Sequence, residues 1–164
     1  MARSTPHKAV APQRHIALDT YPGHAIRRLQ QLAVALFMQE SLESGVTPVQ
    51  FAVLYTLSDQ PGIDQRTLAS SVSFDTSTIG GVVDRLEARG LLTRSHSPGD
   101  RRVRLLHLTP EGVELLKTLV PSMKRAQDHI LAPLGAAERK EFMRMMRRVI
   151  EHHEASAAAG AATS

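Results

Sequence analysis

Residues 75–108 decide the fold, and they read DTSTIGGVVDRLEARGLLTRSHSPGDRRVRLLHL. The first part has apolar residues at helical spacing and begins at Asp75, a residue type that caps helix N-termini. Two runs of strand character follow, Leu91–His96 and Val103–Leu108, with the turn-forming sequence SPGD between them. The stretch therefore predicts a helix followed by a β-hairpin.

Capping residues predict three further helices around this stretch. Asp64 begins a short helix just upstream, and Thr47 followed by Pro48 begins another before it. Thr109 followed by Pro110 begins a long helix after the hairpin. Two short helices followed by a hairpin are the elements of a winged helix-turn-helix. We therefore predict a mainly α-helical chain in which the small β-hairpin is the wing.

Helices with apolar stripes flank this unit on both sides. We place the winged helix-turn-helix at about 47–108 and the flanking helices at 22–44 and 110–154. An apolar stripe packs either against the core of its own domain or against a second subunit. Because these helices flank a unit of the kind that reads DNA, we interpret them as dimerisation helices and expect a homodimer.

The chain has 164 residues, enough for one domain. We assign that domain to residues 19–154, with a flexible basic tail at 1–18 and a flexible alanine-rich tail at 155–164. No apolar run has the length of a signal peptide or a membrane span, so we expect a cytoplasmic protein without a membrane partner. The lack of cysteine excludes disulfides, thiolate metal sites and thiol-based redox sensing.

The net charge of +4 hides a strong local imbalance. Residues 84–104 contain six arginines and no lysine, against three acidic residues. Arginine suits bidentate recognition of phosphate and guanine better than lysine does. A solvated arginine-rich face is the alternative, but a position in and after a helix-turn-helix favours double-stranded DNA as the partner.

The predicted helix that begins at Asp75 is the one that enters the major groove in a helix-turn-helix. Hydroxyl side chains near its start can bind bases or phosphates. Gly80-Gly81 costs this helix roughly 1 kcal/mol per glycine, and either close approach to DNA or close helix packing explains that cost. The candidate DNA contacts on the two helices are Gln65, Thr67, Thr76, Ser77, Thr78, Gly81 and Arg85.

The predicted wing carries a second group of candidate DNA contacts. Its tip, GDRR, places two arginines where a narrow minor groove attracts them, and Asp100 can hold the Arg102 guanidinium in an inserting pose. Arg94 follows the helix and can reach a phosphate. The candidate contacts on the wing are Arg94, Asp100, Arg101, Arg102 and Arg104.

These residues carry a family resemblance. Thr78–Arg94 (TIGGVVDRLEARGLLTR), the DRR of the wing tip and Leu108–Gly112 (LTPEG) resemble the MarR family of bacterial transcription factors. Thr47–Phe51 resembles the T-x-x-Q segment of that family's second helix, and the resemblance covers about residues 22–154. It departs at Gly80-Gly81, where many members carry Thr-Arg, which shifts base reading toward the helix start and the wing.

The resemblance implies a homodimer that binds a pseudo-palindromic operator, usually as a repressor. It also implies a pocket for a small-molecule effector where the dimerisation helices meet the winged domain. Occupancy of that pocket typically respaces the two recognition helices. A ligand that prefers the form not bound to DNA lowers DNA affinity by linkage. We expect no cofactor.

The segment Tyr21–Gln31 is similar to the start of MarR-type regulators of aromatic-acid catabolism. His24 and Arg28 lie one helical turn apart and can hold a carboxylate together. The alternatives are an ordinary core position for Phe51 and Phe74, and a salt bridge to the other subunit for Arg28. The candidate ligand-binding residues are Tyr21, His24, Arg28, Phe51, Tyr55 and Phe74.

Metal sensing and enzymatic activity are the main alternatives to a ligand-released repressor. Eight histidines raise metal sensing, but no pair has i,i+4 spacing on a helix, and we expect no metal site. No G-x-S-x-G, H-E-x-x-H or phosphate-loop motif is present, so we expect no enzyme. The alternatives that remain are a constitutive or architectural winged-helix protein and a metal-responsive regulator.

Overall fold

The structure, a computed structural model, describes residues 17–161. The chain forms two compact units, Met1–Gln31 and Leu32–Ser164. In the first, a 3-10 turn, η1 (Leu18–Thr20), is followed by the beginning of α1 (Pro22–Glu40). The described side chains of this unit are exposed, apart from a half-buried His24. The predicted basic tail at 1–18 lies almost entirely outside the described residues.

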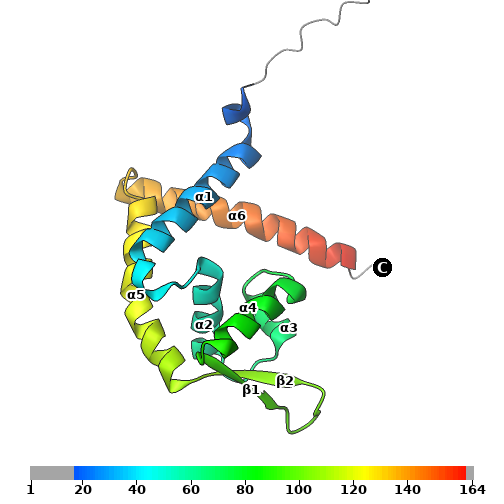
Figure 1. Cartoon of the computed structure of the whole chain (residues 1–164). Helices are drawn as coiled ribbons and strands as arrows, with labels where there is room; N and C mark the ends of the chain where they lie inside the picture. The colour runs from blue at the N-terminus through cyan, green and yellow to red at the C-terminus, as the bar shows by residue number, and fades with distance from the viewer. Residues whose placement is uncertain (1–16, 162–164) are drawn as a thin grey trace, which may run out of the picture. The chain divides into compact units, whose positions relative to one another are not determined.

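The second unit contains the end of α1 and all later elements, in the predicted order (Figure 1). The fold is mainly α-helical with one two-stranded hairpin, which confirms the predicted fold class. The elements are η2 (Leu42–Ser44), α2 (Pro48–Asp59), α3 (Gln65–Ser71), α4 (Thr76–Ala88), β1 (Leu92–His96), β2 (Arg104–Leu108), α5 (Pro110–Ile130) and α6 (Ala136–Ala161).

The capping residues read from the sequence begin the helices of the second unit. Thr47 Oγ1 accepts a hydrogen bond from the Gln50 amide at 3.3 Å, and Gln50 Oε1 accepts one from the Thr47 amide at 2.9 Å. This reciprocal capping box starts α2. Asp64, Asp75 and Thr109 likewise accept hydrogen bonds from first-turn amides of α3, α4 and α5. The helix starts are therefore set by local sequence.

The hairpin is antiparallel, with Leu92 opposite Leu108 in the register. Backbone hydrogen bonds also join it to the segment before α3. The Leu106 amide donates to the Ile63 carbonyl, and the Gly62 amide donates to the Leu106 carbonyl, each at 2.9 Å. The wing is therefore fixed to the helix-turn-helix through its own backbone.

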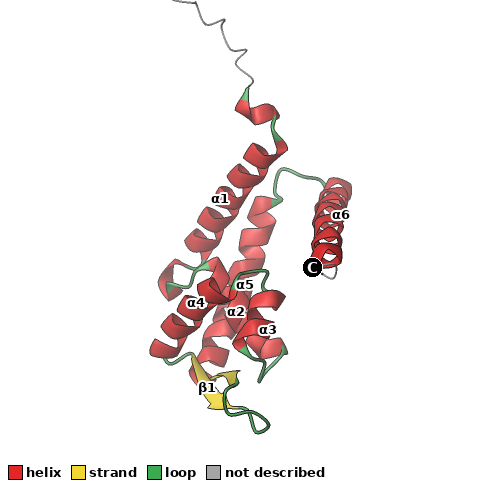
Figure 2. Ribbon diagram, turned by 90° about the vertical axis from the view of Figure 1, so that its right-hand side faces the viewer, coloured by secondary structure: helices red, strands yellow, loops and turns green. Residues whose placement is uncertain are grey.

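The core lies among α2, α3, α4 and the base of the hairpin, which gather together in Figure 2. Ser73, with φ of 56°, makes the left-handed turn between α3 and α4. This turn lets both helices bury one face against α2. The fully buried larger side chains are Val46, Val53, Leu54, Leu57, Leu68, Ile79, Val82, Val83, Leu86, Leu92 and Leu106.

The LTPEG element fixes the start of α5 against the connection between α4 and β1. Thr109 Oγ1 donates to the Gly90 carbonyl at 2.7 Å. A Cβ atom on Gly112 would collide with the carbonyl oxygen of Leu91, so only glycine fits at this position. Gly90 itself is left-handed, with φ of 71°, as is common for a glycine just after a helix.

The last helix, α6, is longer than predicted. Residues 155–161, expected in a flexible tail, are helical, because alanine has the highest helix propensity. None of the described side chains on α6 is buried in the single chain. Among residues 17–161, no helix is both long enough and apolar enough to cross a membrane.

Candidate nucleic-acid interface

The arginines of residues 84–104 fall into two groups. Two are committed within the chain: Arg94 forms ion pairs with Asp84 and Glu87, and Arg89 Nη2 donates to the Ser44 carbonyl at 3.0 Å. The others are exposed and their guanidiniums form no hydrogen bond or ion pair within the described part of the chain. These free guanidiniums belong to Arg85, Arg101, Arg102 and Arg104.

The structure departs from the phosphate contact predicted for Arg94. This residue lies on β1, and its guanidinium is shared between two carboxylates of α4, Asp84 and Glu87. Partial burial alone would lower the pKa of Arg94, but the hydrogen bond that Arg94 donates to Asp84 and the negative charge of Glu87 outweigh it and raise that pKa. The geometry makes Arg94 a positioning residue that joins the wing to the recognition helix.

At the start of α4, the hydroxyls predicted to face DNA are already directed by Asp75. Ser77 Oγ donates to Asp75 Oδ1 at 2.5 Å, and Thr78 Oγ1 donates to Oδ2 at 2.6 Å. These bonds hold the pKa of Asp75 well below its usual range. A hydroxyl has one proton, so Ser77 and Thr78 can only accept further hydrogen bonds. The Thr76 hydroxyl has no partner among the described residues and can still donate.

The start of α3 shows the same arrangement. Thr67 Oγ1 donates to Asp64 Oδ2 at 3.0 Å, while Gln65 Nε2 donates to the Thr76 carbonyl at 3.2 Å. The amide hydrogen bond from Thr67 is the main cause that lowers the pKa of Asp64. Both predicted contacts, Gln65 and Thr67, therefore also order the two helices. Arg66, which lies between them, was not among the predicted DNA contacts. It has an exposed guanidinium and is the one basic residue in 29–83.

The two glycines of α4 have different surroundings. A Cβ atom on Gly80 would lie 3.1 Å from Gln65 Nε2, so helix packing explains this glycine. A Cβ atom on Gly81 would lie 3.5 Å from Arg85 Nη1, an ordinary contact with a side chain of the same helix. Gly81 is therefore half-buried, beside a guanidinium that has no partner within the described part of the chain.

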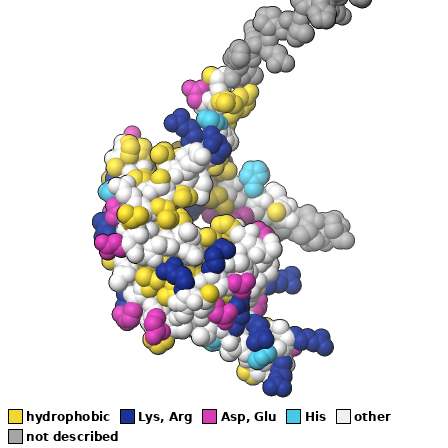
Figure 3. Space-filling model, in the orientation of Figure 1, with side chains coloured by type: hydrophobic (Ala, Val, Ile, Leu, Met, Phe, Trp, Pro, Cys, Tyr) yellow, Lys and Arg dark blue, Asp and Glu magenta, His cyan; other side chains and the backbone are white. Residues whose placement is uncertain are grey.

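The wing tip differs in one detail from the prediction. Asp100 Oδ1 accepts a hydrogen bond from the backbone amide of Arg102 at 2.9 Å, and not from its guanidinium. His96 Nδ1 lies 2.8 Å from the Arg101 carbonyl oxygen. Asp100 therefore shapes the turn while the arginine side chains stay free. Basic side chains project from the hairpin end of the molecule in Figure 3.

The predicted ligand-binding residues divide between the two units. Tyr21, His24 and Arg28 belong to the first, where Arg28 is exposed and forms no ion pair among the described residues. In the second unit the rings of Phe51 and Tyr55 stack with centroids 5.8 Å apart.

The core alternative is correct for Phe51, which is 7% exposed and also contacts the ring of Phe37 at 5.7 Å. It is wrong for Phe74, which is 45% exposed and makes no ring contact within the described part of the chain. Tyr55 is 53% exposed. Of the three predicted ligand-binding rings in the second unit, one is therefore buried and two are exposed.

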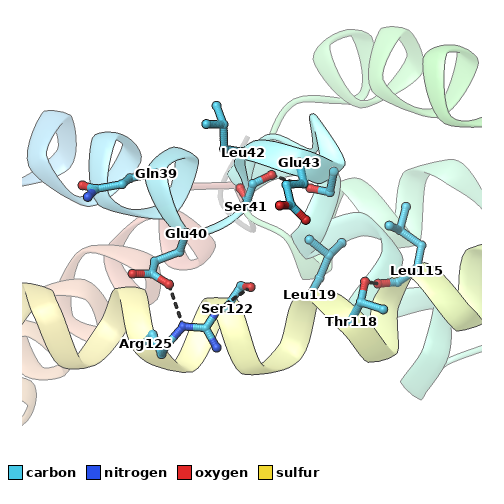
Figure 4. A pocket seen from close by; sticks show the side chains of 11 residues that line it. Gln39, Glu40, Ser41, Leu42, Glu43, Leu115, Thr118, Leu119, Ser122 and Arg125 are labelled. Carbon is cyan, nitrogen blue, oxygen red and sulfur yellow. Dashed lines mark hydrogen bonds and ion pairs between the residues drawn. The ribbon is translucent and has the colours of Figure 1, made fainter.

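A pocket of about 650 Å³ lies elsewhere, between the end of α1 with η2 and the middle of α5 (Figure 4). Glu40 projects into it and pairs with Arg125 Nε at 2.6 Å and with His129 Nδ1 at 3.4 Å. Glu43 adds a second carboxylate to its lining. These acidic groups disfavour a carboxylate ligand there, and none of the predicted ligand-binding residues lines this pocket.

A helix-turn-helix whose attached hairpin carries free arginines is a winged helix-turn-helix, a DNA-binding class. A sequence model of the MarR family matches residues 46–103. The chain is 31% identical over 152 residues to the HTH-type transcriptional repressor NicR of Pseudomonas putida. The alignment covers 93% of this chain and 96% of NicR. The chain therefore belongs to the MarR family of transcriptional regulators, which confirms the predicted family and the prediction against an enzyme.

Solved structures agree with this assignment. The PcaV transcriptional regulator of Streptomyces coelicolor, crystallised with its natural ligand, is 41% identical. The alignment covers 85% of this chain and 98% of PcaV, with a TM-score of 0.78. BpsR of Bordetella bronchiseptica, whose DNA binding is regulated by 6-hydroxynicotinic acid, is 34% identical. That alignment covers 85% and 97%, with a TM-score of 0.77.

Proposed function

We propose that this protein is a cytoplasmic transcriptional repressor that binds a pseudo-palindromic operator as a homodimer and is released by a small aromatic carboxylate. One observation carries the DNA-binding part. The guanidiniums of Arg85, Arg101, Arg102 and Arg104 on α4 and the wing are exposed and have no partner among residues 17–161. Free arginines on a groove-reading helix and its hairpin suit phosphates and base edges. The similarity to NicR, a repressor, supports the sign of regulation.

The homodimer is supported by the exposed apolar residues of α6. Val149 is 56% exposed and Ile150 is 53% exposed, and Met145 lies on the same helix one turn before Val149. None of the described side chains of α6 is buried in the single chain, and so many apolar residues along one helix favour packing against a partner surface over exposure to water. A second copy of this chain supplies such a surface by symmetry.

The dimer is tested by measuring mass in solution with light scattering. Ile150→Glu places a charge in the apolar stripe and should shift the protein toward monomers. Arg144→Glu, which helical spacing places on the face of α6 away from Met145, Val149 and Ile150, is the matched control and should stay dimeric. A monomeric wild type at micromolar concentration would contradict the proposal.

An aromatic carboxylate is proposed as the effector because of two side chains on α1. His24 and Arg28 lie one turn apart, and neither side chain has a polar partner among the described residues. A guanidinium and an imidazole at this spacing can bind one carboxylate. PcaV and BpsR, which act with a natural ligand and with 6-hydroxynicotinic acid, are relatives of this chain.

The effector is tested by fluorescence anisotropy of a duplex selected by the protein from a random library. Benzoate, 4-hydroxybenzoate and 6-hydroxynicotinic acid are added. Cyclohexanecarboxylate, which lacks an aromatic ring, and benzamide, which lacks the negative charge, are the controls. At least one aromatic acid should release the DNA, and Arg28→Met should bind the duplex but resist release. If no acid changes the affinity, the constitutive alternative is correct.

A further inference from the structure

The exposed face of the recognition helix has a gap that one guanidinium fills. Gly81 has no side chain, and the position of its missing Cβ lies 3.5 Å from Nη1 of Arg85. Side chains of a helix lean toward its N-terminus. The Arg85 guanidinium therefore lies about one turn before its own Cα, over Gly81, and points toward the N-terminal half of α4.

This guanidinium is not neutralised inside the chain. Asp84 and Glu87, the acidic residues next to it on α4, are both held by Arg94. Arg85 is exposed and has no hydrogen bond or ion pair among residues 17–161. Its donors are therefore available to a ligand from outside.

The position of the guanidinium favours a base over a phosphate. In a helix-turn-helix the N-terminal half of the second helix meets base edges in the major groove. Arg85, Gly81 and Thr78 follow one another at spacings of four and three along one side of α4, so the guanidinium shares a face with the start of the helix. A planar guanidinium matches O6 and N7 of guanine with two parallel hydrogen bonds.

Resting on the proposed DNA-binding function, we propose that Arg85 reads one guanine in each half-site and that Gly81 permits this by leaving room for its guanidinium. Arg85 belongs to the last turn of α4, but its guanidinium reaches back beside Gly81, so a guanidinium is still present at the middle of the recognition helix although neither Gly80 nor Gly81 can supply one. The hydroxyls of Ser77 and Thr78, which can only accept, are left to bases that present amino groups.

The test is selection of duplexes from a random library by the full-length protein, followed by sequencing. The wild type should select one guanine per half-site with a preference of roughly 10- to 100-fold over other bases. Arg85→Lys keeps the charge but loses the planar fork. It should lose that guanine while its affinity for calf-thymus DNA and the salt dependence of that affinity stay unchanged.

Substitutions at Gly81 test the gap separately. Gly81→Ala makes only an ordinary contact and should keep the selected guanine. Gly81→Leu fills the space and should lose the guanine, with a thermal unfolding curve that shows an intact fold. The proposal is overturned if Arg85→Lys or Gly81→Leu selects the same guanine as the wild type. If the wild type selects no sequence at all, the proposed function itself falls.

Discussion

The guanidinium of Arg94 on β1 forms an ion pair with the carboxylate of Asp84 on α4, and this pair joins the wing to the recognition helix. The carboxylate of Glu87, one turn further along α4, forms a second ion pair with another nitrogen of the same guanidinium. Since Arg101, Arg102 and Arg104 are carried by the hairpin, this pair helps to set where the wing arginines lie relative to α4. One arginine of the segment thus orients others that remain free.

Arg94→Met should separate positioning from phosphate contact. Loss of this partly exposed pair should lower the free energy of unfolding by about 1 kcal/mol. Operator affinity should fall, but the slope of log affinity against log salt should not change, because no phosphate contact is lost. Anisotropy titrations at several salt concentrations measure both quantities. A slope reduced by about one would restore the phosphate role for Arg94.

Arg102→Ala should change the two quantities in the opposite way from Arg94→Met: the salt slope should fall and the stability should stay nearly constant. Its guanidinium is free at the wing tip, and each lost phosphate contact lowers the log–log slope by about one. The free energy of unfolding should change little. Arg144→Ala, an arginine of α6 paired with Glu141, is the control and should leave the slope unchanged. Unchanged affinity and slope in Arg102→Ala would remove the wing from the DNA interface.

Gly112→Ala should destabilise the protein strongly. The added Cβ would collide with the carbonyl oxygen of Leu91, so backbone must move, at a cost of about 2 kcal/mol or more. Gly23→Ala, where nothing lies within 4 Å of the added Cβ, should be neutral or stabilising in α1. Chemical denaturation compares the two variants. Equal stabilities would show that the start of α5 is not packed against Leu91.

The carboxylate of Asp75 should make the stability of the protein vary with pH in the acidic range. Because hydrogen bonds from Ser77 and Thr78 lower its folded-state pKa, its contribution is present above the unfolded value of about 4 and is lost as pH falls below it. Asp75→Asn still caps the helix but has no charge to titrate. The fall in melting temperature between pH 6 and pH 3 should therefore be smaller in this variant. Asp59→Asn is the control, because the exposed Asp59 side chain forms no hydrogen bond within the described part of the chain, and its melting temperature should fall like that of the wild type.

The sequence predicted well the features that depend on near neighbours. Caps such as Thr47 and Asp75 act within three residues, so the helix starts follow from the local pattern. Whether an arginine is free depends on the fold. Arg89 is bound by the carbonyl of Ser44, far away in the chain, and Arg94 by the preceding helix. Ser44 lies outside the arginine-rich stretch, and Asp84 and Glu87, which lie inside it, meet Arg94 only because β1 folds back beside α4. The sequence therefore could not separate contact residues from positioning residues.

A footprint tests the central claim most directly, namely that this chain reads operator DNA as a symmetric dimer. Hydroxyl radicals are applied to a duplex selected by the wild-type protein. We expect two protected half-sites with centres about one helical turn, roughly 10 bp, apart. A single protected half-site, or uniform protection without sequence preference, would contradict it.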